Sequence, residues 1–173
     1  MTELNKPLTI DEIEFRVQSV TAKGAIILPY KDARADMNRL DESVGALNWK
    51  RENVVIDGNI HCIVSIWCEK KQQWVSKMDV GTESNTEAVK GQVSDAFKRA
   101  CFNWGIGREL YDYPLIFVQL NNEEKANPKA FNFALKKWRW HSEFSDGKLS
   151  YLGAHDGKSI RFEYGKRKNI VKR

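Results

Sequence analysis

The first part of the chain alternates between apolar and polar residues, as half-buried strands do. Over residues 12–19 every second residue from Ile13 to Val17 is apolar, which predicts a strand with one buried face. A short turn that contains Gly24 separates it from a second apolar run at residues 25–30. Two such runs joined by a short turn predict an antiparallel hairpin.

The apolar period then becomes helical. Apolar side chains recur every three or four residues over 33–44, which predicts an amphipathic helix. Asp32 is the expected N-cap, and Gly45 is the expected C-terminal stop. Arg34 and Arg39 lie off the apolar stripe, so we expect them to face another partner.

Three further strands are predicted at residues 49–56, 60–69 and 74–80. The turns between them are too short for parallel crossovers, so they form an antiparallel meander. In the middle strand Cys62 shares a face with Val64, Ile66 and Cys68, and the neighbouring residues face the other way.

A long helix follows the meander. Ser84 and Glu87 have the spacing of a capping box, and an apolar stripe runs from Val89 to Trp104. Basic residues project from the other side, where Asp95 has the spacing for an ion pair with Arg99. The helix ends in the turn Trp104-Gly105-x-Gly107.

The last third of the chain is less regular. A short strand is predicted near residues 115–120, a polar linker at 121–129 and a small β meander at 136–164, followed by a basic tail. The pattern predicts an α+β protein with two domains, a core at residues 1–120 and a C-terminal part at 121–173.

Composition places the chain among folded globular proteins, with 42% hydrophobic and 29% charged residues. Its apolar runs are too short to cross a membrane, and its start lacks the order of a signal peptide. We therefore expect a cytoplasmic protein without a membrane partner. The three cysteines lack the spacing of a disulfide framework or a zinc site, which predicts reduced thiols.

Signatures of catalysis are missing from the sequence. Neither a dinucleotide fingerprint nor a phosphate-binding loop is present, so we expect no cofactor and no ATP-driven chemistry. A magnesium site for phosphodiester cleavage could be assembled on paper from carboxylates, although no spacing among them favours it over caps and ion pairs. These carboxylates are Asp32, Asp36, Asp79, Glu83, Glu87 and Asp95. We expect no catalytic residue and no metal ligand.

Basic residues outnumber acidic ones, 28 to 23, which gives a net charge of +5. Such an excess favours a polyanionic partner when the charges share a surface. With tryptophans at 49, 67 and 74 as possible stacking platforms, the predicted phosphate-binding track comprises Lys90, Lys98, Arg99, Arg34, Arg39, Lys50, Lys70, Lys71 and Lys77.

The order of five separated motifs resembles the single-strand annealing proteins of the Rad52 superfamily, in particular its short bacterial and phage members. The similarity covers roughly residues 10–115. The motifs are Tyr30 with the helix after it, Gly45-x-x-Asn48-Trp49, Asp79-x-Gly81, Ser94-Asp95-x-x-Lys98-Arg99-Ala100 and Trp104-Gly105-x-Gly107.

This resemblance implies a β-β-α-β-β-β-α core, with an antiparallel sheet packed against a long helix, and a small C-terminal β meander beside it. Protomers of the family assemble into a ring or an open helical filament without nucleotide, with single-stranded DNA in a basic groove. The groove-lining pair corresponds to Lys98 and Arg99, with Lys90 on the same helix. Where eukaryotic members have a basic residue at the position of Ala35, this chain has Arg34 next to it.

The resemblance predicts ATP-independent binding and annealing of single-stranded DNA in recombination and repair, by a homo-oligomer rather than an enzyme. A phage exonuclease or a host single-strand-binding protein is an expected further partner. Two alternatives stay open: a protein that protects single strands without annealing them, and, more remotely, a metal-dependent nuclease.

Overall fold

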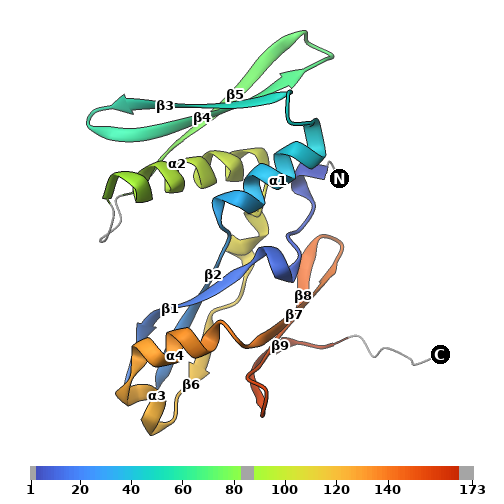
Figure 1. Cartoon of the computed structure of the whole chain (residues 1–173). Coiled ribbons are helices and arrows are strands. Elements are labelled where there is room, and N and C mark those ends of the chain that lie inside the picture. Colours follow the sequence, from blue (N-terminus) through green and yellow to red (C-terminus); the bar gives the residue numbers. More distant parts are fainter. Residues whose placement is uncertain (1–2, 83–87, 168–173) are drawn as a thin grey trace, which may run out of the picture. The chain divides into compact units, whose positions relative to one another are not determined.

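The computed structural model describes residues 3–82 and 88–167 of the chain, which form two compact units (Figure 1). The first unit consists of residues 1–6 and 31–108, and the second of residues 7–30 and 109–173. These units are not the segments 1–120 and 121–173 that the sequence analysis predicted as domains, and that division stays a prediction.

The first unit packs two helices against a three-stranded antiparallel sheet with the order β3-β4-β5. Figure 1 shows α2 lying along one face of this sheet and α1 beside it. The elements are a short 3-10 helix η1 (Glu3–Asn5), α1 (Ala33–Val44), β3 (Trp49–Ile56), β4 (Asn59–Cys68), β5 (Gln73–Val80) and α2 (Ala88–Trp104).

The core of this unit forms where the apolar face of the sheet meets the apolar stripe of α2. Cys62, Val64 and Ile66 alternate along β4 and are buried against Phe97 and Cys101 of α2. The other face of β4 does not belong to this core, as its period of two predicts. The predicted meander and both predicted helices are therefore confirmed.

Two glycines let the chain reverse direction after α2. Gly105 and Gly107 have φ values of 100° and 70°, in the left-handed region that residues with a Cβ rarely adopt. A Cβ on Gly105 would in addition lie 2.0 Å from the Asn5 side chain. The capping box predicted at Ser84 and Glu87 lies outside the described residues.

The second unit contains two three-stranded antiparallel sheets with the orders β1-β2-β6 and β7-β8-β9. They enclose a separate core that includes Phe15, Ile27, Val118, Phe131 and Leu152. The elements are η2 (Ile10–Glu12), β1 (Glu14–Val20), β2 (Gly24–Tyr30), η3 (Arg108–Asp112, which begins at the last residue of the first unit), β6 (Ile116–Gln119), α3 (Asn122–Ala126), α4 (Pro128–Leu135), β7 (Arg139–Ser145), β8 (Lys148–His155) and β9 (Ile160–Gly165). The α+β class and the C-terminal meander are confirmed.

The predicted linker at residues 121–129 is wrong, because this segment forms α3 and the start of α4. The Asn121 side chain accepts from the backbone N–H of Glu124, and the Glu124 carboxylate accepts from the backbone N–H of Asn121. This pair is a capping box. Asn127 caps α4 in a similar way, and Pro128 stands in its first turn, where proline is tolerated.

All three cysteines are free thiols, as the sequence predicted. Cys62 and Cys101 are completely buried, whereas Cys68 at the end of β4 is half-buried. Burial raises the pKa of the Cys62 thiol to about 11 and raises that of Cys101 as well, so both remain protonated at neutral pH.

Candidate nucleic-acid interface

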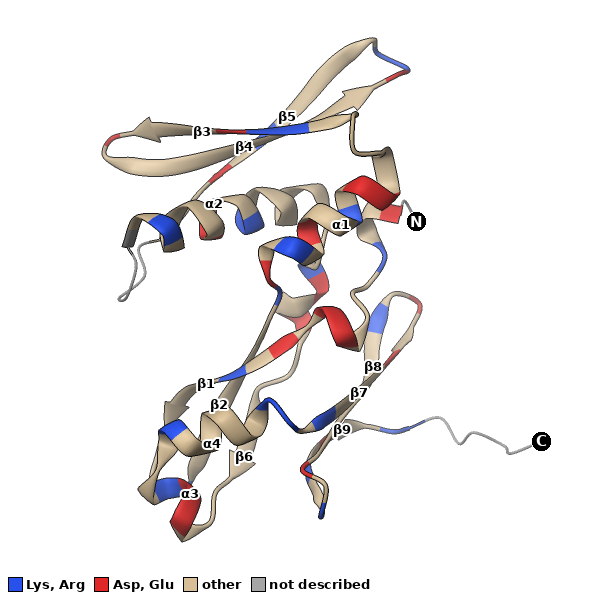
Figure 2. Cartoon of the chain, in the orientation of Figure 1, with Lys and Arg blue, Asp and Glu red and all other residues tan. Residues whose placement is uncertain are grey.

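The outward side of α2 presents the Lys98-Arg99 pair. The opposite side of the helix is anchored by Ala96, Phe97 and Ala100, which are all fully buried. Both basic side chains are half-buried on the remaining surface of the helix. Figure 2 shows basic residues on α2, on β3 and at the turn between β4 and β5. The pair is thus carried by a rigid element rather than by a loop.

Close packing between the end of β5 and α2 fixes the position of that helix. A Cβ added to Gly81 would lie 2.0 Å from the carbonyl oxygen of Gln92, so only glycine permits this approach. The Gln92 side chain donates to the carbonyl of Gly81. The Asp95 carboxylate accepts from both the backbone N–H and the hydroxyl of Thr82, at 3.0 Å each.

Arg99 is oriented by Asp79 and not by Asp95, so the ion pair expected from the i,i+4 spacing is wrong. The Arg99 Nε lies 3.3 Å from Asp79 Oδ1, while Asp95 is engaged by Thr82. The physical reason is that β5 brings the Asp79 carboxylate beside the helix, whereas the Asp95 carboxylate is occupied by two hydrogen bonds from Thr82. The Arg99 side chain is 39% exposed.

Lys98 differs from Arg99 in its surroundings. Its ammonium group makes no hydrogen bond or salt bridge within the described ranges 3–82 and 88–167. Its backbone carbonyl, by contrast, accepts a hydrogen bond from the Lys31 ammonium at 3.4 Å. The Lys98 side chain is therefore available to an anion, while its backbone is hydrogen-bonded to the segment that precedes α1.

A buried ion pair lies beside this hydrogen bond between Lys31 and the Lys98 carbonyl. The Lys31 ammonium contacts the Asp36 carboxylate directly, and both side chains are almost completely inaccessible to solvent. Burial raises the pKa of Asp36 to about 6, against the opposing effect of Lys31. The ring of Phe102 lies 4.2 Å from the same ammonium, which adds a cation–π contact.

Arg34 and Arg39 on α1 differ in exposure. Arg34 pairs with Asp32 at 2.7 Å and is 80% exposed, so it stays a predicted DNA contact. Arg39 is only 5% exposed, and its guanidinium donates to the backbone carbonyls of Glu3 and Lys6. The expectation that Arg39 faces another partner is wrong, because it holds the N-terminal segment against α1.

The other predicted contacts do not all gather around Lys98. Arg51 is paired in register with the buried Val64, so it lies on the sheet face that packs against α2. Its neighbour Lys50 therefore lies on the opposite face, turned away from α2. Its ammonium stands 5.2 Å from the ring of Trp74. The exposed Lys70 and Lys71 occupy the turn between β4 and β5, and the exposed Lys90 lies at the start of α2.

Lys77 is the predicted residue that reaches the end of α2. Its ammonium donates to the carbonyl of Asn103 at 2.6 Å and lies 4.7 Å from the ring of Trp104. Sequence reasoning missed Arg108, which donates to the carbonyls of Phe102 and Asn103. A basic residue just after a helix is a signal for such contacts with the last carbonyls.

The described members of the carboxylate set considered for a metal site do not converge. Asp32 caps α1, Asp36 is paired with Lys31, and Asp79 is bound by Arg99. Within the described part of the chain no three His, Cys, Asp or Glu residues are arranged to hold a metal ion. Glu83 and Glu87 lie outside that part. Among the described residues no helix has the length and apolar character that a membrane span requires.

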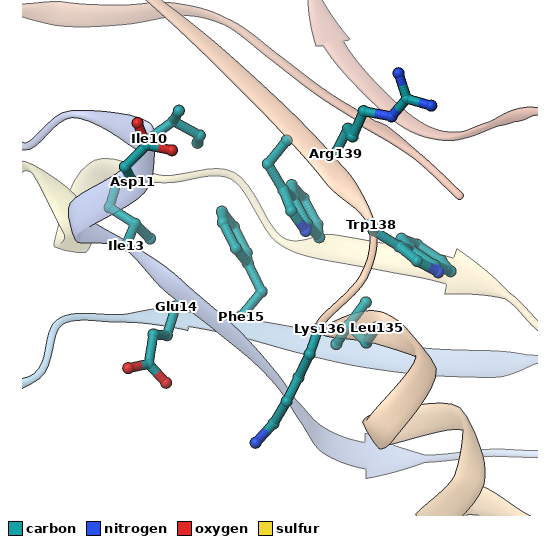
Figure 3. Close-up of a pocket in the computed structure, with 10 residues that line it drawn as sticks. Ile10, Asp11, Ile13, Glu14, Phe15, Leu135, Lys136, Trp138 and Arg139 are labelled. Atoms are coloured by element: carbon teal, nitrogen blue, oxygen red, sulfur yellow. The ribbon is translucent and has the colours of Figure 1, made fainter. Parts of the chain in front are cut away.

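The second unit contains a cavity of about 610 Å³ between η2, β1, the end of α4 and the start of β7 (Figure 3). Its lining includes acidic residues, Asp11 and Glu14, as well as basic ones, Lys136 and Arg139. In Figure 3 the Lys136 and Arg139 side chains extend away from Phe15. Charges of both signs give no field that selects a polyanion, so this cavity offers no specific site for nucleic acid.

Comparison with known proteins identifies relatives of this chain. The chain is similar to the single-stranded DNA-binding protein DdrA of Deinococcus radiodurans, with 36% identity over 92 residues, or 52% of this chain and 43% of the relative. The corresponding protein of Deinococcus deserti is 33% identical over 103 residues, which cover 58% of this chain and 50% of the relative. The aligned region spans half or less of the length of these relatives.

The model of a protein family matches residues 1–129, which include both helices of the first unit and the Lys98-Arg99 pair. That range is about three quarters of the chain and contains the five motifs on which the resemblance rests. The chain belongs to the Rad52/22 family of double-strand break repair proteins.

Proposed function

We propose that this protein binds single-stranded DNA and pairs complementary strands without ATP, in recombination and repair. The observation that carries the proposal is the Lys98-Arg99 pair on the outward side of α2. Asp79 orients one of these cations, and the other makes no hydrogen bond or salt bridge within the described residues. Membership of the family and the single-stranded DNA binding of the Deinococcus relatives support the proposal.

The mechanism is electrostatic. Contacts to phosphate bind every sequence alike, and each phosphate that a lysine or arginine neutralises releases condensed counterions. Holding one strand in this way leaves its bases available and lowers the charge repulsion that opposes a second strand. No bond is made or broken in this scheme, so it calls for neither a catalytic residue nor a cofactor.

A homo-oligomer, as a ring or a helical filament, is part of the proposal. Single protomers offer few phosphate contacts, whereas a row of protomers extends the interface along the strand. An exonuclease that produces single strands and a host single-strand-binding protein that occupies them are proposed partners, since both share the substrate.

The first experiment is annealing of two complementary labelled oligonucleotides without nucleotide, with mass photometry of the same sample. We expect rapid annealing by a large oligomer. Tight binding without annealing would instead support a protein that protects single strands, a second candidate that the name of the Deinococcus relatives favours. Absence of binding at low salt would refute both.

Replacement of the basic pair tests the interface itself. The variant Lys98→Ala with Arg99→Ala should bind oligo(dT) at least tenfold more weakly, because each cation removed takes away a charge-assisted bond to phosphate. Its plot of log affinity against log salt should be shallower by about 0.7 for each phosphate that is no longer neutralised. Fluorescence anisotropy from about 50 to about 300 mM salt measures both quantities.

The matched control is Lys23→Ala with Lys148→Ala, two exposed lysines of the second unit. It changes the net charge equally and should retain the parent's affinity within about twofold. Equally weakened binding in the two variants would mean that overall charge, and not this helix surface, determines binding.

A further inference from the structure

Two cations converge on a single oxygen at the C-terminal end of α2. The Lys77 ammonium lies 2.6 Å from the carbonyl oxygen of Asn103, and Nη2 of Arg108 lies 3.1 Å from the same oxygen. Arg108 also reaches the carbonyl of Phe102 through Nε at 3.0 Å and through Nη2 at 2.8 Å. Both side chains belong to exposed residues.

Among the described residues these cations have no carboxylate in direct contact. Within residues 3–82 and 88–167 neither Lys77 nor Arg108 forms a salt bridge with a carboxylate. The partial negative charge of a helix C-terminus is about half a unit, so it offsets only part of two positive charges. Two neighbouring like charges repel each other, and an anion between them would remove this repulsion.

The surroundings hold the Lys77 ammonium in place before any ligand arrives. The ring of Trp104 lies 4.7 Å from the Lys77 ammonium, and the indole N–H of Trp104 donates to the carbonyl of Val64 at 3.0 Å. Pre-organised charges bind an anion better than mobile ones, because less conformational entropy is lost.

Asn103 links these two cations to a third. Its side-chain amide donates to Asp79 Oδ2 at 3.3 Å and to the carbonyl of Met78 at 3.1 Å. Asp79 in turn holds Arg99 through its other oxygen. Lys77, Arg108 and Arg99 therefore belong to one network, in which Asp79 is the carboxylate.

Unused hydrogen-bond donors remain on both cations. An ammonium group has three donors and a guanidinium has five. Lys77 uses one for Asn103, and Arg108 uses those of Nε and Nη2, which leaves its Nη1 without a hydrogen bond in the described structure. A phosphate with several acceptor oxygens fits these remaining donors.

We propose that Lys77 and Arg108 form a phosphate-binding site at the end of α2, with Asn103 as its positioning residue. This inference rests on the proposed function, since the ligand is a backbone phosphate of the bound single strand. It extends the interface from Lys98 and Arg99 along the helix to the turn at Gly105. The simpler alternative is that both cations only cap the last carbonyls of α2.

The test is the double variant Lys77→Gln with Arg108→Gln. Glutamine can still donate to the helix carbonyls, so a purely capping role would be preserved, whereas the charge is removed. We expect about tenfold weaker binding of fluorescein-labelled oligo(dT) at low salt and a salt slope shallower by about 0.7. The matched control with the same charge change is Lys23→Gln with Lys148→Gln.

The outcomes separate this proposal from the proposed function. If the parent binds DNA and the double variant matches the control in both affinity and slope, the phosphate site is refuted and the interface at Lys98 and Arg99 stands. If the parent does not bind DNA, the proposed function itself is refuted. Circular dichroism establishes whether the double variant is folded.

A second variant covers the case in which the glutamines unfold the protein. Lys77→Arg with Arg108→Lys exchanges the two cations and keeps their charge, so it should bind within about threefold of the parent with an unchanged salt slope. The single variant Lys77→Gln, which leaves the Arg108 cap intact, should then show the shallower slope. An unchanged slope in that single variant would overturn the proposal.

Discussion

At the scale of single residues, the Lys31–Asp36 pair matters because it is buried beneath the proposed interface. Burying two charges costs several kcal/mol of desolvation for each, and mutual attraction offsets this only with good geometry. The pair spans from the segment before α1 to the helix itself and reaches the Lys98 carbonyl on α2. We infer that it fixes how α1 meets α2.

This pair predicts an unusual dependence of stability on pH. The pKa of Asp36 is raised in the folded state to about 6 from an ordinary 3.8, so its stabilising contribution is complete below about pH 4 and is lost as pH rises through 6. Lys31→Met removes the opposing cation and raises this pKa further. The variant should therefore lose more stability than the parent between about pH 5 and pH 8, by about 1.4 kcal/mol for each added unit.

Urea unfolding at several pH values between about 5 and 8 measures this difference. The matched control is Lys31→Met with Asp36→Asn, in which residue 36 no longer titrates. The stability of this control, relative to the parent, should not fall as pH rises through 6. A Lys31→Met variant whose stability is flat across this range would show that Asp36 is already ionised without its partner.

At the scale of elements, the position of α2 depends on its close approach to β5. Gly81 and Gln92 are in backbone contact, and the Asp79-x-Gly81 segment both orients Arg99 and permits this contact. A single stretch at the end of β5 therefore sets the distance of the helix from the sheet and the direction of one of its cations.

Gly81→Ala should move the helix. Its Cβ would stand 2.0 Å from the Gln92 carbonyl oxygen and 2.8 Å from the Ala96 nitrogen, so the elements must separate, at a cost of about 1–3 kcal/mol. We expect a lower unfolding midpoint and weaker DNA binding together.

Gly58→Ala is the matched control for that change. It lies in the turn between β3 and β4 with a φ of 77° and open space around its Cβ position, so it should cost only about 1 kcal/mol of strain. DNA affinity of the folded control should equal that of the parent. A Gly81→Ala variant whose unfolding midpoint equals that of the parent would contradict the close approach.

At the scale of the whole molecule, the chain forms two hydrophobic cores rather than one in its described part. It passes between the two units three times, after residues 6, 30 and 108. Each core thus combines segments that are far apart in sequence. The proposed interface belongs to the first unit, and the second unit contains β7, β8 and β9, which lie beyond the family match.

Two cores predict two separable responses to core mutations. Phe97→Ala removes a fully buried side chain of the first unit, and Leu152→Ala does so in the second. Each should cost about 2–5 kcal/mol. Hydrogen exchange followed by mass spectrometry should show faster exchange mainly in the unit that carries the substitution. Equal acceleration across all peptides in both variants would show one cooperative unit instead.

Much of this fold could be predicted because its elements are strongly periodic. The alternation along β4 and the stripe along α2 place Cys62 and Phe97 in the core without any structural information. Burial of Arg39 could not be predicted, since its partners Glu3 and Lys6 are distant in sequence. At the interface, the Lys98-Arg99 motif is local and could be recognised in the sequence. The contacts of Asp79 and Lys77 with α2 could not, because they depend on the register of β5.

The prediction of a linker at residues 121–129 is wrong for a different reason. Polar residues around Pro128 resemble a connection when only hydrophobicity is considered, yet two asparagines there cap helices. Capping residues and turn residues are the same types, so sequence composition does not separate them. Phe131 and Leu135 pack into the core of the second unit, and this packing stabilises α4 as a helix.

The unequal exposure of the three thiols gives the native chain a ready attachment point for optical probes. Cys62 and Cys101 are sealed in the core, and Cys68 alone of the three reaches solvent, two residues before the Lys70-Lys71 turn. A maleimide dye should therefore react at one position without any mutagenesis. Energy transfer from that dye to a labelled oligonucleotide would follow strand arrival and pairing in real time.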